Sequence, residues 1–370
     1  MFRHVHTTAG HWQEAARVAV TALGSLPAPD VLAFLYVSDR FATEMDDLLD
    51  YLRRHTGIQH WVGTVGMGLC SAGQESYEEG GMVLLVTDIP DSQFQLIPNL
   101  TTRVDRFLDS NMAWRRQAGA HFGVVHGDPT NAETPTLIES LANGMDPGFL
   151  VGGLSSSETT LPQLCDRVVS GGISGVMFAS TVEVTTGLSQ GCSLIGRRHE
   201  VTEGERNIIL KIDDRPAMDV FEEEIGEVLA RDLSRVGGFI FAALPIAGSD
   251  TGDYLVRNLV GVDPENRILA IGDYVRPGMP IQFARRDGQT AREDLIRMLE
   301  DTRARAGKRV RGGLYFSCLG RGRQLFGEES AEMRLVQHYL SDIPLAGFYA
   351  NGEIFHNRLY GYTGVLTLFH

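Results

Sequence analysis

The chain has 370 residues, of which 43% are hydrophobic and 22% charged, and its formal net charge is −14. Such an acidic chain argues against nucleic-acid binding, because phosphate recognition relies on lysine and arginine. The N-terminal segment lacks the continuous apolar core of a secretory signal, and no apolar run approaches the ~20 residues of a membrane helix. We therefore expect a cytoplasmic protein with no membrane partner.

The cysteines give no sign of a metal site or a disulfide framework. Four of them are present, at Cys70, Cys165, Cys192 and Cys318, and no two form a C-x-x-C pair. Widely separated cysteines in a reducing compartment are typical of free thiols. The sequence also contains no metalloprotease, Walker-type or EF-hand motif, so it predicts neither a metal nor another cofactor.

Taken in chain order, the first recurring unit lies in the N-terminal quarter. The apolar run 31–41 predicts a strand, and the helical spacing of leucines in 43–57 predicts a helix that ends at Gly57. An apolar segment that breaks into glycines, 61–68, predicts a second strand. The buried-looking run 80–89 predicts a third. The unit therefore has the order β-α-β-β.

The same order occurs twice more. The second unit is expected in 121–129, 134–144, 149–158 and 171–184, and the third in 311–322, 330–342, 344–353 and 361–370. Glycine supports a true repeat, because an apolar-x-Gly anchor occurs at equivalent places, namely Gly63, Gly152 and Gly347. A fourth, degenerate copy is predicted to begin at 237–247. Self-similarity of this kind indicates a repeated structural unit.

The segment between the second and third units has a different character. "NIILKI", residues 207–212, predicts a strand, followed by a turn at Asp213 and Asp214. Pro216 then predicts the start of a helix rich in acidic residues near its N-terminus. We place a domain boundary here, between modules 1–218 and 219–370. The predicted fold is α/β, with repeated β-α-β-β units that form mixed sheets covered by helices.

Candidate binding residues follow the predicted strands. Ligands of α/β proteins gather at the carboxyl ends of strands, and glycine there lets the backbone approach them closely. The guanidinium groups of the "GRGR" loop are suited to carboxylates or phosphates. The alternative is that Gly and Ser only make turns and that the arginines are solvated. The candidate ligand-binding residues are Arg321, Gly322, Arg323, Asn351, Glu353, Ser155, Ser156 and His126.

Catalytic motifs are weak. "GLSQG", residues 187–191, matches the G-x-S-x-G elbow, but the next segment is glycine-broken and not helical, so we interpret it as a chance match. The glycines of 317–327 do not form the dinucleotide fingerprint. The sequence therefore predicts no enzyme, although Cys318 or Cys70 could act as a nucleophile if it were one. His199 is one weak candidate for a haem ligand.

Several stretches resemble the FIST family. They are "QGCSLIGRRHEVTEGERNIILKIDDRPAMDVF" (190–221), "GMPIQFARRD" (278–287), "FSCLGRGRQLFGEESAEM" with "IPLAGFYANGEI" (316–354) and "FLVGGLSSS" (149–157). The resemblance implies an N-terminal and a C-terminal FIST domain, covering nearly the whole chain. It departs from the family in 63–75, where "GTVGMGLCSAGQE" lacks the usual compact Gly-Cys-Ser/Thr-x-x-Gly-Glu loop.

The resemblance implies a signal-input protein that senses a small ligand such as an amino acid and passes the signal to a separate output partner. Our leading hypothesis is thus a cytoplasmic sensory protein for a small polar or anionic metabolite. Some similar bacterial proteins bind haem and respond to nitric oxide, which makes a haem-based sensor the first alternative. A scaffold that binds only a partner protein is the second.

Overall fold

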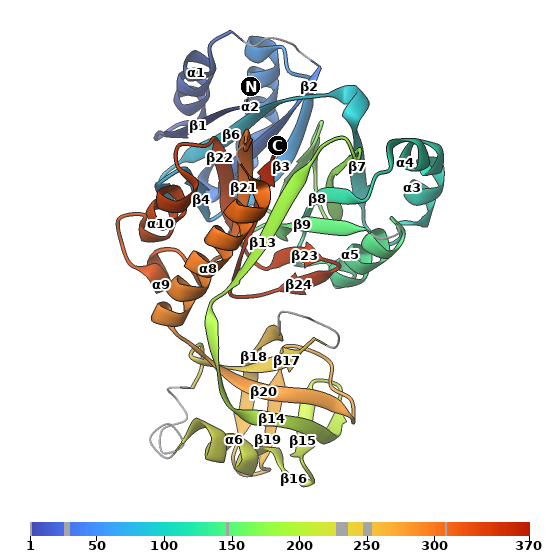
Figure 1. The fold of residues 1–370 in the computed structure, drawn as a ribbon, viewed down its shortest axis with the longest axis vertical. Coiled ribbons are helices and arrows are strands. Elements are labelled where there is room, and N and C mark those ends of the chain that lie inside the picture. Colours follow the sequence, from blue (N-terminus) through green and yellow to red (C-terminus); the bar gives the residue numbers. More distant parts are fainter. Residues whose placement is uncertain (1, 26–29, 146–147, 227–235, 247–253, 308) are drawn as a thin grey trace. The chain divides into compact units, whose positions relative to one another are not determined.

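The computed structural model describes residues 2–25, 30–145, 148–226, 236–246, 254–307 and 309–370. The backbone divides into two compact units, residues 1–190 with 294–370 and residues 191–293. Three six-stranded sheets form the larger unit and one seven-stranded sheet forms the smaller (Figure 1). The predicted α/β class is correct in its coarse form. The predicted boundary between modules 1–218 and 219–370 refers to domains that follow one another in the sequence, whereas the larger compact unit combines both ends of the chain. The predicted boundary therefore stays a prediction.

The three sheets of the larger unit have the same strand order. The first runs β1 (Arg3–Thr8), β6 (Gly81–Pro90), β2 (Val31–Ser38), β3 (His60–Gly66), β10 (Gln163–Cys165) and β11 (Val168–Val169). The second runs β7 (Phe94–Leu100), β12 (Ile173–Phe178), β8 (Phe122–Gly127), β9 (Phe149–Leu154), β23 (Glu353–His356) and β24 (Arg358–Tyr360). The third runs β13 (Val184–Gln190), β25 (Thr363–Phe369), β21 (Gly312–Cys318), β22 (Leu345–Ala350), β4 (Gly68–Ser71) and β5 (Gln74–Tyr77).

Each predicted β-α-β-β unit folds in the same way. Its first two strands are parallel, as in β2 with β3, β8 with β9 and β21 with β22, and its last strand is antiparallel to the first. The hairpin between the second and last strands leaves its own sheet and extends the next one. Hairpin β4–β5 therefore joins the third sheet, β10–β11 joins the first and β23–β24 joins the second. This cyclic exchange ties the three repeats together.

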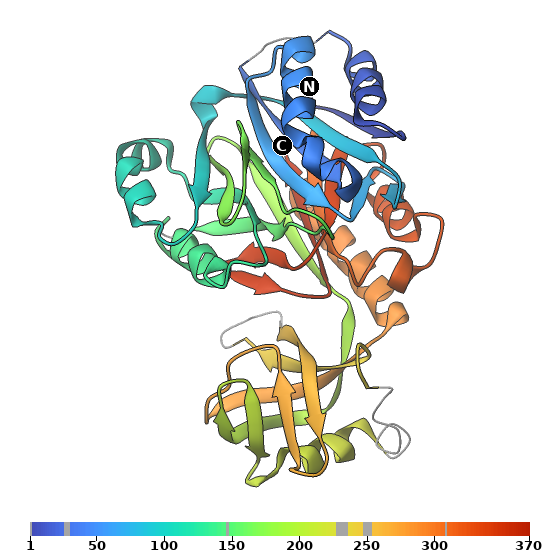
Figure 2. The ribbon, with the colours of Figure 1, turned by 180° about the vertical axis from the view of Figure 1, so that it is seen from behind.

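Helices cover one face of each sheet (Figures 1 and 2). Their apolar residues and those of the adjacent strands form the buried clusters of the first two sheets. The described helices of the larger unit are α1 (Trp12–Leu23), η1 (Asp39–Glu44), α2 (Met45–Thr56), η2 (Asp91–Gln93), α3 (Asp105–Ser110), α4 (Met112–Ala118), α5 (Thr134–Asn143), α8 (Gly288–Ala306), α9 (Arg323–Phe326) and α10 (Ala331–Leu340). The first residues of α8 belong to the smaller unit. No described helix is both long and apolar enough to cross a membrane.

The opposite faces of the sheets meet in an aromatic centre. The first strand of each repeat carries one ring at an equivalent position, namely Tyr36, His126 or Phe316. Each directly follows the residue whose carbonyl oxygen faces the anchor glycine of the parallel strand. Their rings lie 5.5–6.1 Å apart, and Phe348 stacks on Tyr36 at 5.1 Å. Such pairs add to the free energy gained from burial alone. The three repeats therefore share one core.

Helix α8 covers the open edge of the third sheet. Arg305 donates a hydrogen bond to the carbonyl of Thr186 at 2.7 Å, and Arg297 reaches that of Leu188 at 3.4 Å. Both carbonyls belong to the outer strand β13. An uncovered strand edge is a template for pairing with another chain, and charged side chains over it prevent that.

The described part of the smaller unit is an antiparallel sheet with a helix packed against it. Its strands are β14 (Cys192–Glu205), β20 (Met279–Arg286), β17 (Ile240–Pro245), β18 (Tyr254–Asp263), β19 (Ile268–Ile271), β15 (Ile208–Ile212) and β16 (Arg215–Pro216), with β14–β15 pairing closing the sheet. Helix α6 (Ala217–Ile225) begins after Pro216, as predicted. The predicted fourth repeat is wrong. Strand β17 pairs antiparallel with β18 and β20, so it lacks the parallel neighbour that defines a repeat.

Substitution of an anchor glycine should greatly lower the free energy of unfolding. A Cβ on Gly63 would lie 1.7 Å from the carbonyl oxygen of Leu35, and one on Gly347 would lie 1.7 Å from that of Tyr315. Because both neighbours are backbone, the strands must separate. We expect Gly347→Ala to lower the free energy of unfolding by about 3 kcal/mol or more. Denaturant unfolding measures it. Gly10→Ala is the control, since nothing lies within 4 Å of that position. Equal stability of the two variants would contradict this role.

Candidate functional site

A cavity of about 500 Å³ opens at the carboxyl end of β2. Its walls come from the start of η1, the turn after β3, the turn between β5 and β6, and the segment that follows β9. Both the first and the second repeat therefore contribute. The lining residues are Ser38, Asp39, Arg40, Thr43, Met67, Glu78, Glu79, Glu158 and Thr159.

Hydrogen bonds hold these segments in place. Asp39 accepts hydrogen bonds from the hydroxyls of Ser157 and Thr159, the second at 3.1 Å. Ser38 accepts one from the backbone N–H of Gly81 at 2.8 Å. Arg40 reaches the carbonyl of Glu78 at 3.4 Å. The cavity walls are thus tied to one another by side chains and not only by the backbone.

The charges of the cavity are unequal. Asp39, Glu78, Glu79 and Glu158 contribute carboxylates, against the single guanidinium of Arg40. Arg323 lies at the margin, where it forms an ion pair with Glu78 and places its guanidinium 4.6 Å from the centre of the Tyr77 ring. A ligand with an ammonium group suits this lining better than a ligand that carries only negative charge, because the surrounding carboxylates stabilise a nearby positive charge.

The most elaborate polar cluster lies under helix α10. Glu332 accepts hydrogen bonds from Tyr315 at 2.8 Å, from Ser317 at 3.0 Å and from the backbone N–H of Gly322 at 2.8 Å. Nε of Arg321 donates to the same carboxylate at 2.9 Å. The side chains of Arg321 and Glu332 are both 0% exposed. Arg321 is therefore the partner of an internal carboxylate and not of a solvated ligand.

Burial works against the charged guanidinium of Arg321, but the Glu332 carboxylate outweighs it, and the pKa of Arg321 is raised. The guanidinium also lies 5.0 Å from the centre of the Phe326 ring, and Nη2 reaches Ser189 at 3.4 Å. Its Nη1 has no partner among the described residues. This Ser189 belongs to the "GLSQG" match, and strand β14 follows it instead of a helix, so the chance interpretation is correct.

Glu353 is a second buried carboxyl group near the same strand ends. Burial raises its pKa to about 8, although hydrogen bonds from the hydroxyl and the backbone N–H of Thr363, at 2.7 and 3.0 Å, act in the opposite direction. Its other oxygen has no partner in the described part of the chain. Burial also raises the pKa of the nearby Cys318 thiol, and Glu353 adds to that shift.

Ser155, Ser156 and His126 have internal partners. Ser155 lies 2.7 Å from the hydroxyl of Thr64. Ser156 accepts a hydrogen bond from Met67 at 3.0 Å and donates one to the carbonyl of Tyr349 at 2.6 Å, so it joins all three repeats. His126 lies in the aromatic centre, where burial lowers its pKa to about 3.

The predicted site residues are thus distributed over several environments. Gly322 has a φ of 52° and is the N-cap residue of α9, while Asn351 is exposed. Arg321 and Gly322 meet at Glu332, and Arg323 reaches the cavity through Glu78. The sequence analysis missed most of the lining residues. Asp39 and Arg40 directly follow a buried strand, which is the same sequence signal that marked the predicted loops. Glu78 and Glu79 lie in the turn between β5 and β6, which no periodicity of the sequence marks.

His199 has both ring nitrogens engaged. Nδ1 lies 2.7 Å from Asp213 and Nε2 lies 3.0 Å from Glu224, and the ring is buried within the smaller unit. A metal could bind His199 only by displacing one of these carboxylates. No cluster of three or more His, Cys, Asp or Glu residues in the described part of the chain could hold a metal ion.

Comparison with known proteins gives two family matches. Residues 31–215 match the FIST N domain and residues 217–356 match the FIST C domain. The uncharacterized protein Rv0628c of Mycobacterium tuberculosis is 29% identical over 373 aligned positions, which cover 96% of this chain and 95% of the relative. The uncharacterized protein Mb0898c of Mycobacterium bovis is 32% identical over 255 positions, covering 65% of this chain and 66% of the relative.

The internal ion pair can be tested by mutation. Removing either Arg321 or Glu332 leaves an uncompensated buried charge, which costs about 3–5 kcal/mol of stability. We expect Glu332→Gln and Arg321→Met each to lower the unfolding midpoint strongly. Arg323→Gln breaks a more exposed pair and should cost under about 1 kcal/mol. Chemical denaturation compares the three. A mild effect of Arg321→Met would show that its charge does not support the fold.

Glu353 predicts a dependence of stability on pH. Its pKa in the folded chain is about 8, above the ~4.3 of an unfolded chain, so the folded state holds this proton more tightly. The stability it contributes is present in acid and is lost as the pH rises through 8. In the window from about pH 7.5 to 8.5 His126 contributes little, because its pKa is about 3 in the folded state and about 6.5 in an unfolded chain, so that it is almost entirely neutral in both states. With Glu353→Gln, the denaturation midpoint should change less with pH across this window. An unchanged dependence of the midpoint on pH would contradict the raised pKa of Glu353.

Proposed function

We propose that this chain, which belongs to the FIST family, is a sensory protein that binds a small metabolite with an amino group and a carboxylate, such as an amino acid. FIST domains are proposed sensory signalling domains, and this chain carries both the N and the C domain. The ligand would occupy the cavity at the end of β2. The observation that carries the proposal is the mixed charge of that cavity.

The lining offers partners for both ends of such a ligand. Asp39 and Glu158 would accept hydrogen bonds from the ammonium group, and Arg40 would donate to the carboxylate. The excess of carboxylates argues against a purely anionic metabolite, which the sequence had left open. At about 500 Å³, the cavity falls in the lower half of the range of small-molecule sites, roughly 300–1,000 Å³.

We also propose that the chain binds its ligand without transforming it. Nucleophilic cysteines need a lowered pKa, because the thiolate is the reactive form. Burial instead raises the pKa of Cys70, of Cys318 and of Cys165, the last to about 12. These three thiols are therefore protonated at neutral pH. The two cysteines considered as nucleophiles, Cys70 and Cys318, are both in this group.

The two alternatives have less support. A haem-based sensor would need an axial ligand, and His199 is already bonded at both ring nitrogens. A protein partner finds support in exposed apolar side chains of the smaller unit. Tyr274 is 80% exposed and Val260 is 59% exposed. Such residues suit contact with an output protein that would receive the signal, so a partner complements ligand sensing rather than replacing it.

A thermal-melt panel with amino acids, simple amines and simple carboxylates tests the proposal. A ligand that binds only the folded state adds about 2.7 kcal/mol at a hundred times its dissociation constant. We expect amino acids to raise the melting temperature, while matched compounds that lack the amine or the carboxylate have little effect. The concentration dependence gives the affinity.

Two variants locate the binding. Arg40→Gln should weaken binding of the carboxylate, and Glu158→Gln should weaken binding of the amine, each by about tenfold. Glu139→Gln on α5 lies outside the cavity and serves as the matched control. Amino-acid binding that survives both cavity changes would remove the site. A panel with no response would remove the proposed ligand class.

A further inference from the structure

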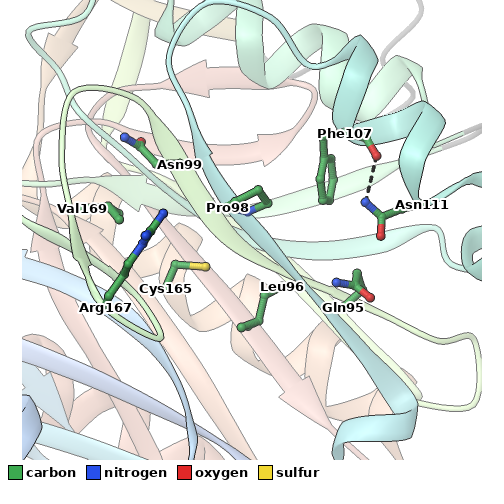
Figure 3. A pocket seen from close by; sticks show the side chains of 9 residues that line it. All are labelled: Gln95, Leu96, Pro98, Asn99, Phe107, Asn111, Cys165, Arg167 and Val169. Carbon is green, nitrogen blue, oxygen red and sulfur yellow. Dashed lines mark hydrogen bonds between the residues drawn. The ribbon is translucent and has the colours of Figure 1, made fainter.

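A second cavity of about 310 Å³ lies elsewhere in the larger unit, between parts of the second and the first sheet. One wall is β7, the outer strand of the second sheet, and the other is the β10–β11 hairpin of the first sheet. Phe107 from α3 and the nearby Asn111 complete it (Figure 3). It shares no lining residue with the cavity at the end of β2.

The middle of this second cavity is apolar. Leu96 and Pro98 from β7 face it together with Phe107 and Cys165 (Figure 3). Pro98 has no backbone N–H, so the strand offers no donor at that point. The thiol of Cys165 donates to the carbonyl of Ile97 at 3.2 Å, and it contributes a neutral surface. An aromatic ring or a short alkyl chain would be favoured here, because its burial removes apolar area from water.

The two ends of the cavity are polar (Figure 3). Arg167 and Asn99 lie at one end, and Gln95 and Asn111 lie at the other. Arg167 is exposed, and although its backbone carbonyl accepts a hydrogen bond from Cys165, its guanidinium has no hydrogen-bond or ion-pair partner among the residues that the structure describes. No acidic side chain lines the cavity. The guanidinium is therefore available to an incoming anion, which the apolar middle would help to hold.

The Asn99 amide gives the same end a second function. Its nitrogen donates to the carbonyl of Ser170 at 2.6 Å, which fixes the side chain against the β11 end of the hairpin. Its oxygen is buried and has no partner in the described residues. This oxygen is an acceptor, so it would take a hydrogen bond from a donor group of the ligand or from water, while the carboxylate binds the guanidinium of Arg167.

We infer that this cavity is a binding site for a small monocarboxylate with an apolar body. Arg167 binds the carboxylate, and Leu96, Pro98 and Phe107 contact the body. A hydroxyl at the far end of the ligand would hydrogen-bond with the amides of Gln95 or Asn111. Hydroxyphenyl carboxylates have this distribution of groups. The acidic cavity at the end of β2 is unsuited to them, because they carry no ammonium group.

Calorimetric titration of the full chain with para-hydroxyphenylacetate tests the inference. We expect saturable binding that weakens at least about tenfold for the neutral para-hydroxyphenylacetamide, because a charge-assisted hydrogen bond is lost. Arg167→Gln should weaken the acid to the same degree and leave the amide unchanged. Arg116→Gln, an exposed arginine on α4 outside the cavity, should bind like the unmodified chain.

A cavity-filling variant gives an independent test. Val169→Trp places a large side chain on the wall of the cavity and should abolish binding, whereas Glu158→Gln, in the other cavity, should leave it intact. Circular dichroism of each variant verifies the fold. Absence of binding to the unmodified chain would overturn the inference. So would equal affinity of the acid and the amide, or undiminished binding by Arg167→Gln or by a folded Val169→Trp.

Discussion

The close approach of two parallel strands at one glycine is the constraint on which each repeat depends. At Gly63, Gly152 and Gly347 a side chain would point into the neighbouring strand, within 1.7–1.8 Å of a carbonyl oxygen. Only glycine leaves room for the two backbones at such a contact. After the second strand of each repeat the chain leaves its own sheet, and the following hairpin joins the next one. Three such exchanges close the larger unit around Tyr36, His126 and Phe316.

Two repeats line the first cavity, and the second cavity lies between the second sheet and a hairpin that the exchange adds to the first sheet. The segment from Glu158 to Val169 lines the first cavity at one end and the second at the other, and between them it forms β10. Strand β10 pairs with β3 of the first repeat. A ligand in either place therefore contacts residues whose positions depend on how two repeats are joined. This arrangement suits a protein in which binding alters packing between repeats.

The third repeat differs in how it uses charge. Its strand ends enclose Arg321, Glu332 and Glu353, all of them buried. The pair of Arg321 with Glu332 offsets the cost of removing two charges from water only because Tyr315, Ser317 and Gly322 also bond to the carboxylate. Such a network specifies one arrangement of the α9 loop and α10. In the first repeat, by contrast, the charged residues after β2 remain at a cavity, where a ligand can reach them.

The sequence by itself determined the three repeats, the helix after Pro216 and the family, because these depend on periodicity, on turn residues and on motifs that are local in the chain. It also identified the strand ends as the polar parts of the molecule. Only the tertiary structure decided which of those polar residues face a cavity. Arg321 and Asp39 both follow a buried strand, yet one pairs inside the protein and the other lines an opening. The difference arises from which helix and which exchanged hairpin pack over each strand end, and these lie far away in the sequence.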